Sequence, residues 1–131
     1  ICSYQVPVGT ASAPGKTLYI TGYTIEGVVT TALVGGPVVG AWSICFGHNA
    51  VSLATATSAT GKAPVRIPSG FQVYPVTAAV GAVGARLQDD FDRGPIVVHP
   101  GEFIQCVMKN LGTVTSAGVI TFLIKFDGYW E

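Results

Sequence analysis

Short apolar runs, each bounded by turn-forming residues, recur along the chain. The clearest are Lys16–Glu26, Val38–His48 and Val119–Phe126, which are rich in aromatic and β-branched residues and show no helical period. Glycine and proline signals separate such runs about every 8–15 residues. This pattern predicts one all-β domain of about eight antiparallel strands, arranged as a β-sandwich or barrel.

Alternation within two of these runs predicts which side chains enter the core, because neighbouring residues of a strand point to opposite faces. In Lys16–Glu26, regular alternation places one set of side chains together: Tyr19, Thr21, Tyr23 and Ile25. The opposite face then carries Leu18, Ile20, Gly22 and Thr24. In Val38–His48, the face expected in the core carries Trp42, Ile44 and Phe46. Its other face carries Ser43, Cys45 and Gly47, which are small enough for a second chain or sheet to pack closely.

The remaining segments complete the expected organisation. Further short strands are expected at Gly27–Leu33, Phe71–Tyr74, Arg86–Phe91, Pro95–His99 and Glu102–Lys109. Residues 1–15 are interpreted as an arm with a short strand around Tyr4–Val8, and residues 16–131 as the single domain. Residues 49–62 are interpreted as a connector, either a helical turn with a loop or a long exposed excursion.

The segment Val76–Ala85 is small and apolar, which fits either a buried segment or a contact between subunits. Val80 and Val83 are therefore candidate interface residues. The terminal pair Tyr129 and Trp130 are candidates for the same role, because two large rings at a chain end are seldom left in water. Exposed aromatic rings can also bind sugar, so a glycan site is the alternative interpretation of the terminal pair.

A charge-free stretch from Gly27 to Gly61 is long enough to consider a membrane-spanning helix. Gly35, Gly36 and Pro37 lie in its most apolar part and form a strong turn signal, with β-branched residues on both sides. No lysine or arginine flanks this part as an anchor. The stretch therefore predicts two strands joined by a turn, and no membrane partner.

Composition suggests what keeps such a chain in solution. The 131 residues are 49% hydrophobic but only 11% charged, against about 25% charged in an ordinary soluble domain. The net charge is zero and the seven basic residues are scattered, which argues against nucleic-acid binding and removes self-repulsion. We expect much of the surface to be buried against other subunits.

Residues that could carry chemistry are few. Cys2, Cys45 and Cys106 have no metal-binding spacing and indicate no disulfide framework, so they are interpreted as small buried hydrophobic residues. His48 and His99 stand at expected strand ends without a nucleophile motif. We therefore expect no catalytic residue, no cofactor and no enzyme activity.

One acidic cluster, Asp89, Asp90 and Asp92, could offer oxygen ligands to a calcium ion. It lacks the later glycine and glutamate of an EF-hand loop, and Arg86 and Arg93 are close enough in sequence to neutralise it. A solvated turn is the simpler interpretation, and no metal site is predicted.

Three segments resemble surface proteins of tailed-phage virions: PGKTLYITGYTIEG, HPGEFIQCVMKNLGT and AGVITFLIKFDGYWE. The resemblance covers roughly residues 14–131 and rests on the Pro100-Gly101-Glu102 turn and on a last strand that ends in Gly128, Tyr129 and Trp130. It implies a jelly-roll or tumour-necrosis-factor-like β-sandwich, typically trimeric, that decorates or stabilises a phage capsid. The implied partners are copies of the chain and the major capsid protein, and the implied location is the virion. The alternative is a fibre or spike head, or another lectin-like module, that binds surface glycans.

Overall fold

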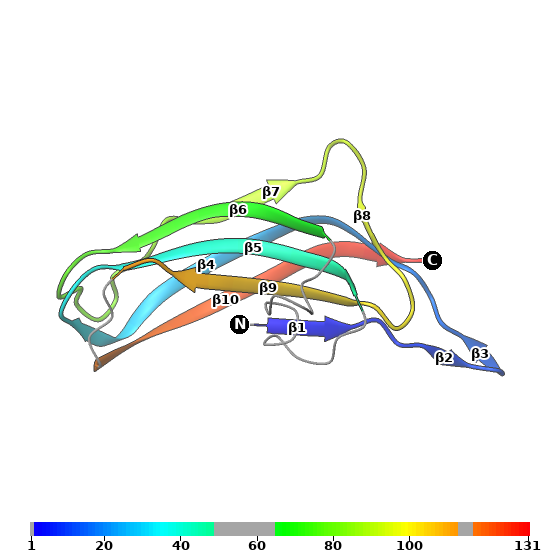
Figure 1. Cartoon of the computed structure of the whole chain (residues 1–131), viewed down its shortest axis with the longest axis horizontal. Helices are drawn as coiled ribbons and strands as arrows, with labels where there is room; N and C mark the ends of the chain where they lie inside the picture. The colour runs from blue at the N-terminus through cyan, green and yellow to red at the C-terminus, as the bar shows by residue number, and fades with distance from the viewer. Residues whose placement is uncertain (1, 49–64, 113–116) are drawn as a thin grey trace.

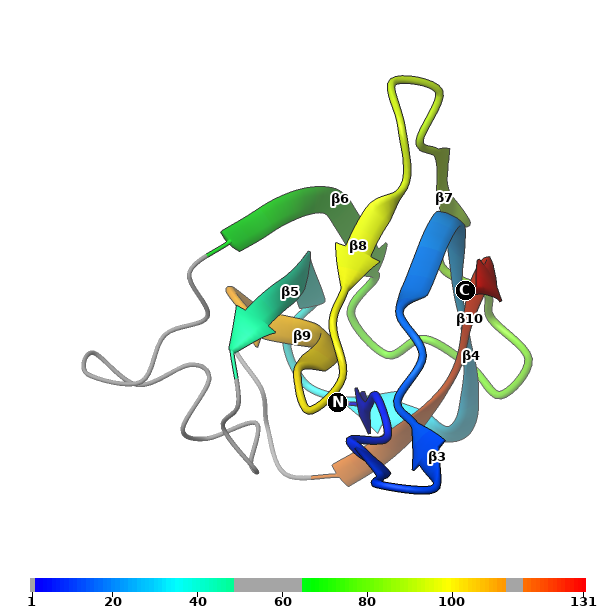
Figure 2. The same ribbon diagram turned by 90° about the vertical axis from the view of Figure 1, so that its right-hand side faces the viewer.

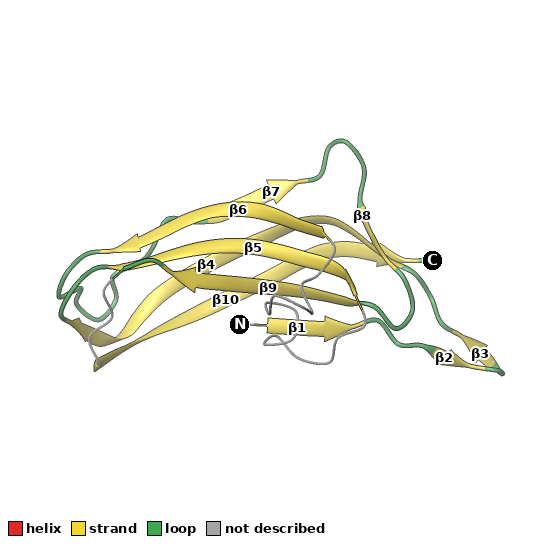
Figure 3. Cartoon of the chain, in the orientation of Figure 1, coloured by secondary structure: helices red, strands yellow, loops and turns green. Residues whose placement is uncertain are grey.

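The structure, a computed structural model, describes residues 2–48, 65–112 and 117–131, and these ranges contain strands and loops but no helix (Figure 3). Every strand pairing in them is antiparallel, so the all-β prediction is confirmed. The ten described strands are β1 (Cys2–Gln5), β2 (Gly9–Thr10), β3 (Ala13–Pro14), β4 (Leu18–Val34), β5 (Val38–His48), β6 (Val65–Tyr74), β7 (Leu87–Asp90), β8 (Ile96–Val98), β9 (Phe103–Asn110) and β10 (Ala117–Trp130).

These strands form two larger sheets and one small hairpin. The β5 sheet has the order β1-β9-β5-β6, and the β4 sheet has the order β10-β4-β7, with β8 also paired to β4. Strands β2 and β3 form the hairpin, which projects from one end of the elongated molecule (Figure 1). Viewed along the strands, β5, β6 and β9 lie in one layer and β4 and β10 in another (Figure 2).

The core lies between the two sheets. The ring of Trp42 from β5 meets the ring of Phe122 from β10 edge-on, with centroids 4.8 Å apart. Ile44 and Ile104 from the β5 sheet and Ile25 from the β4 sheet are fully buried in the same cluster. The core face predicted for β5 is thereby confirmed, with Trp42 and Ile44 buried and Phe46 partly buried against the cluster.

The predicted faces of the first long strand are wrong, because a β-bulge interrupts its alternation. Gly22 pairs with Asp127 but Ile20 pairs with Gly128, so one extra residue, Thr21, stands between consecutive pairs. The bulge turns Leu18 and Ile20 toward the core that Tyr23 and Ile25 also enter. The partner residues that create this shift lie about a hundred positions away along the chain.

Strand β4 also continues to Val34, where the sequence suggested a second strand at Gly27–Leu33. The predicted turn at Gly35-Gly36-Pro37 is confirmed, since β5 begins at Val38. None of the described residues belongs to a helix long and apolar enough to cross a membrane.

Other boundaries differ from the prediction in both directions, since β6 and β10 are longer than expected and β1, β7 and β8 are shorter. Strand β6 begins at Val65, six residues before the predicted start, and β10 includes Tyr129 and Trp130 as its last residues. The strand expected at Tyr4–Val8 begins earlier, as β1, and pairs with β9. The connector expected at residues 49–62 lies outside the described residues.

The small apolar segment Val76–Ala85 runs beside β4 as an irregular extension of the β4 sheet. The Val29 N–H donates to the Ala82 carbonyl at 2.8 Å, and the Gly84 N–H donates to the Gly27 carbonyl at 3.0 Å. Ala78 is buried, but the three valines of this segment are exposed. The interpretation of this segment as buried is therefore wrong for its valines.

Candidate functional site

The four residues singled out from the sequence as interface candidates fall in two separate regions. Val83 lies beside the middle of β4, through a bridge to Val28, which in turn pairs with Thr121 of β10. Trp130 is the last residue of β10, nine positions beyond Thr121. At about 3.3 Å per residue, the two regions are about 30 Å apart along the strand.

The first region is the outer face of the β4 sheet. Strand register places Val83, Val28 and Thr121 in one row across this face, with Leu123 two residues further along β10. Val83 is 75% exposed and Leu123 is 65% exposed. We call this surface, made of Val28, Val83, Thr121 and Leu123, the Val–Leu face.

An ion pair borders the Val–Leu face. The Arg86 Nε lies 3.2 Å from a carboxylate oxygen of Glu26, and Glu26 pairs directly with Leu123 across the strands. A shallow hollow of about 580 Å³ lies among these side chains. The surface is therefore mainly apolar, with its nearest charges already neutralised by each other.

A tyrosine packs beneath this face and requires two glycines. Tyr74 is buried, and its ring meets Phe122 edge-on with centroids 6.5 Å apart. A Cβ at Gly84 would lie 2.6 Å from the Tyr74 hydroxyl oxygen, and a Cβ at Gly27 would overlap that oxygen. The absence of side chains at both glycines makes room for the hydroxyl.

The Tyr74 hydroxyl has no hydrogen-bond partner among the described residues. The Gly84 backbone N–H beside it is already bonded to the Gly27 carbonyl. Burial raises the pKa of Tyr74, and the nearby Gly84 backbone only partly opposes this effect. The hydroxyl thus lies close to the Gly84 backbone without a well-formed hydrogen bond, and its burial costs free energy.

The second region, at the end of β10, holds two aromatic pairs on opposite faces of the sheet, because Tyr129 and Trp130 are consecutive strand residues. Tyr19 and Tyr129 stack with centroids 5.1 Å apart, and Tyr4 meets Trp130 edge-on at 6.4 Å. Mutual backbone hydrogen bonds between Thr17 and the C-terminal Glu131 hold the strand end in place. We call these rings, Tyr4, Tyr19, Tyr129 and Trp130, the aromatic end.

The aromatic end stays accessible to solvent, with Tyr129 46% exposed and Trp130 42% exposed. Trp130 lines two hollows, one of about 370 Å³ shared with Tyr4 and one of about 320 Å³ shared with residues of the β2–β3 hairpin. The arrangement offers flat ring faces beside concave surface, which suits either a protein contact or a sugar ring.

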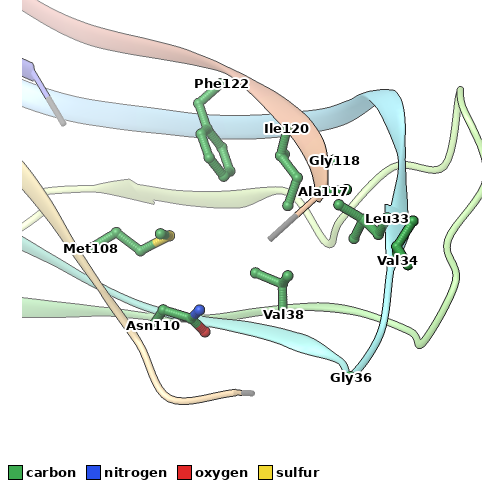
Figure 4. Close-up of a pocket in the computed structure, with 10 residues that line it drawn as sticks. All are labelled: Leu33, Val34, Gly36, Val38, Met108, Asn110, Ala117, Gly118, Ile120 and Phe122. Carbon is green, nitrogen blue, oxygen red and sulfur yellow. The ribbon is translucent and has the colours of Figure 1, made fainter. Parts of the chain in front are cut away.

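A third hollow, of about 350 Å³, lies at the opposite end of the sheets (Figure 4). Its lining is mostly apolar, from Leu33 and Val38 to Met108 and Ile120, with Asn110 as the polar exception. The Asn110 side-chain oxygen accepts hydrogen bonds from the backbone N–H groups of Gly112, at 2.9 Å, and Val39, at 3.4 Å. Asn110 thus supports the local backbone.

Residues considered for chemistry are dispersed. Asp89 and Asp90 belong to β7, and no group of three metal-ligating side chains occurs in the described ranges. The backbone N–H of His99 donates to the Glu102 carboxylate at 2.9 Å, which closes the turn before β9. His48 ends β5, and its side chain lies outside the described part of the structure.

Sequence reasoning missed three of the four residues of the Val–Leu face and two of the four rings of the aromatic end. Leu123 could have been found, because alternation in the run VITFLIKF places it on the face opposite Phe122 and Ile124, which pack against the core. Tyr4 and Tyr19 could not, because they reach the aromatic end through contacts with residues more than a hundred positions away.

Comparison with known proteins identifies no similar protein. The chain matches no protein-family model, no curated protein and no solved structure.

Proposed function

We propose that this chain is a structural subunit that associates with copies of itself, as a homotrimer, through the Val–Leu face. The observation that carries the proposal is the exposure of Val83 and Leu123 on a surface whose neighbouring charges are paired, Glu26 with Arg86 and Lys125 with Asp127. Burying one such side chain contributes about 1.5–3 kcal/mol. Water is therefore an unfavourable environment for this face.

The position of β10 supports the same proposal. It has 14 residues, it pairs with β4, and it is the edge strand of its sheet. Long edge strands favour pairing with another chain unless they are covered. With a net charge of zero, little electrostatic repulsion opposes the approach of a second copy.

The assembled particle is, in this proposal, a phage virion, and the fold is a jelly-roll sandwich of the tumour-necrosis-factor-like kind. The support is the resemblance of residues 14–131 to virion surface proteins, together with sheets that pair strands distant in sequence. Strand β9 lies beside β1 and β10 lies beside β4, so the end of the chain folds back on its beginning. The chain has a structural, non-enzymatic role, decorating or stabilising the capsid beside the major capsid protein.

Light scattering on a dilution series tests self-association. The wild type is expected as a trimer, whereas V83K and L123K place charge in the Val–Leu face and are expected to shift it toward monomer by at least tenfold in dissociation constant. V73K is the matched control, since Val73 is an exposed valine of β6 in the other sheet. A monomeric wild type, or dissociation by V73K alone, contradicts the proposal.

A second candidate function, glycan binding, is favoured by the aromatic end. The partly exposed ring of Trp130 lines two hollows, and a ring beside concave surface is an arrangement on which a sugar face can stack. A glycan array with wild type and W130A tests this function. Hits that disappear with W130A support it, and an array without hits removes it.

A further inference from the structure

Two of the three cysteines face each other across neighbouring strands. Cys2 of β1 is the direct partner of Cys106 of β9 in the antiparallel register. Directly opposed residues have Cα atoms about 4.5–5.5 Å apart, which lies inside the range that a disulfide requires. Neither cysteine forms a disulfide in the structure.

The two thiols are also in contact. The Cys106 thiol makes a hydrogen bond to Cys2, which is the main reason that the pKa of Cys2 is lowered to about 6. The same hydrogen bond, with burial second, raises the pKa of Cys106. The shared hydrogen bond therefore favours the thiolate form of Cys2 and the protonated form of Cys106.

Cys2 and Cys106 differ in their accessibility to solvent. Cys106 is completely buried in the core, whereas Cys2 is partly exposed at the edge of the β5 sheet. Cys45, the third cysteine, pairs with Gln105 and therefore lies on the opposite face of that sheet from Cys106. Burial raises the pKa of Cys45, so it is a poor nucleophile.

We propose that Cys2 and Cys106 are an oxidisable pair, which a small disulfide such as oxidised glutathione converts into a cross-strand disulfide that fastens β1 to β9. The Cys2 thiolate attacks one sulfur of the glutathione disulfide, forms a mixed disulfide and releases one glutathione thiolate. Cys106 then gives up its proton to solvent and attacks the Cys2 sulfur, which forms the Cys2–Cys106 bond and releases the second glutathione. Two protein thiols are oxidised and one glutathione disulfide is reduced.

The attack of Cys106 on the mixed disulfide becomes easier once Cys2 has reacted with glutathione. The main cause that holds the proton on Cys106 is its hydrogen bond to Cys2, and this cause is lost when Cys2 carries glutathione. Cys2 is the more accessible and Cys106 the adjacent resolving thiol, the arrangement expected of a redox-sensitive pair.

The consequence for the fold is a covalently held first strand. β1 is an edge strand with four paired residues, so it is among the more easily detached elements of the sheet. The bond would close a loop of about a hundred residues, and oxidation is therefore expected to raise Tm by about 5–15 °C.

The experiment treats the reduced protein with oxidised glutathione and maps disulfides by peptide mass spectrometry. We expect a Cys2–Cys106 peptide in the wild type and in the control variant C45S. C106S should instead accumulate glutathione on Cys2, and C2S should remain unmodified at Cys106. A bond that includes Cys45, or no bond in folded protein when urea-unfolded protein forms one, overturns the proposal.

Alkylation of the wild type supplies a readout that does not depend on how the variants fold. The rate at Cys2 is expected to rise as pH increases through about 6 and to level off by pH 8, because the thiolate is the reacting form. Cys45 should react only above the ordinary thiol range, if at all. Equal rates and pH profiles for Cys2 and Cys45 would contradict the assignment of Cys2 as the reactive thiol.

Discussion

Strands β9 and β10 follow one another in the described sequence and are similarly apolar, yet they are buried to very different degrees. All five residues from Phe103 to Val107 of β9 are buried, while no residue of β10 is fully buried. Strand β9 lies between β1 and β5, and β10 lies at the edge of its sheet. The position of a strand in its sheet therefore decides how far its side chains are buried. Apolar residues that stay exposed on an edge strand indicate a surface suited to a partner.

The largest effect expected from this comparison is near the start of β9. Ile104→Ala should lower the free energy of unfolding by about 2–5 kcal/mol, because Ile104 is buried in the core and its truncation leaves a cavity. The control is Val119→Ala on β10, where the side chain is half exposed and a change within about 0.5 kcal/mol is expected. Urea unfolding measures both, and equal losses would contradict the contrast.

A smaller loss is expected where β4 runs between β10 and the Val76–Ala85 segment. Gly27→Ala should destabilise by about 1–3 kcal/mol, because the new Cβ would overlap the Tyr74 hydroxyl and lie 2.7 Å from the Phe122 ring. Combining it with Tyr74→Phe should recover part of the loss. Additive effects of the two substitutions, measured in a double-mutant cycle, would show that the hydroxyl is not the source of the clash.

Tyr74→Phe alone should stabilise the protein by about 1 kcal/mol, because it removes a buried hydroxyl without a hydrogen-bond partner. Burial raises the pKa of Tyr74, so the unfolded chain loses this proton before the folded chain does. Stability from this group is present below about pH 10 and falls as pH rises above it. The gain from the substitution should therefore grow above pH 10, and a destabilised variant at pH 7 would reveal a partner for the hydroxyl.

The smallest effect on the unassembled chain is expected on the Val–Leu face. Leu123→Thr should change the free energy of unfolding of the monomer by no more than about 0.5 kcal/mol, since Leu123 is 65% exposed. The dissociation constant of the assembly formed by this variant, measured by sedimentation, should nevertheless rise. A large loss of monomer stability with unchanged association would reverse the assignment of this face.

Local sequence pattern predicted much of the fold and less of the surface. The turn at Gly35-Gly36-Pro37 and the core face of Trp42 and Ile44 follow from residues close together in sequence. The bulge at Thr21 does not, because it depends on the pairing of β4 with β10. Long-range pairing determines which strand lies at the edge of a sheet. The alternation of residues within one strand does not predict that pairing.

The candidate sites show the same division. Val80 and Val83 were chosen from a small apolar segment, and Tyr129 and Trp130 as large rings at a chain end. The structure places Val83 and the terminal pair in separate regions. The pairing of Cys2 with Cys106 could not be predicted, because 104 positions separate the residues and only the register of β1 on β9 joins them. The sequence predicted small buried cysteines, which fits Cys45 and Cys106 but not the partly exposed Cys2.

Footprinting of exposed side chains with a photochemical carbene reagent tests most directly whether a second copy covers β10. Labelling of Leu123 and Val83 should fall at concentrations where the chain associates and recover on dilution, while labelling of Val73 on the other sheet stays constant. Protection of Val73 with unchanged labelling of Leu123 and Val83 would contradict an assembly built on the Val–Leu face.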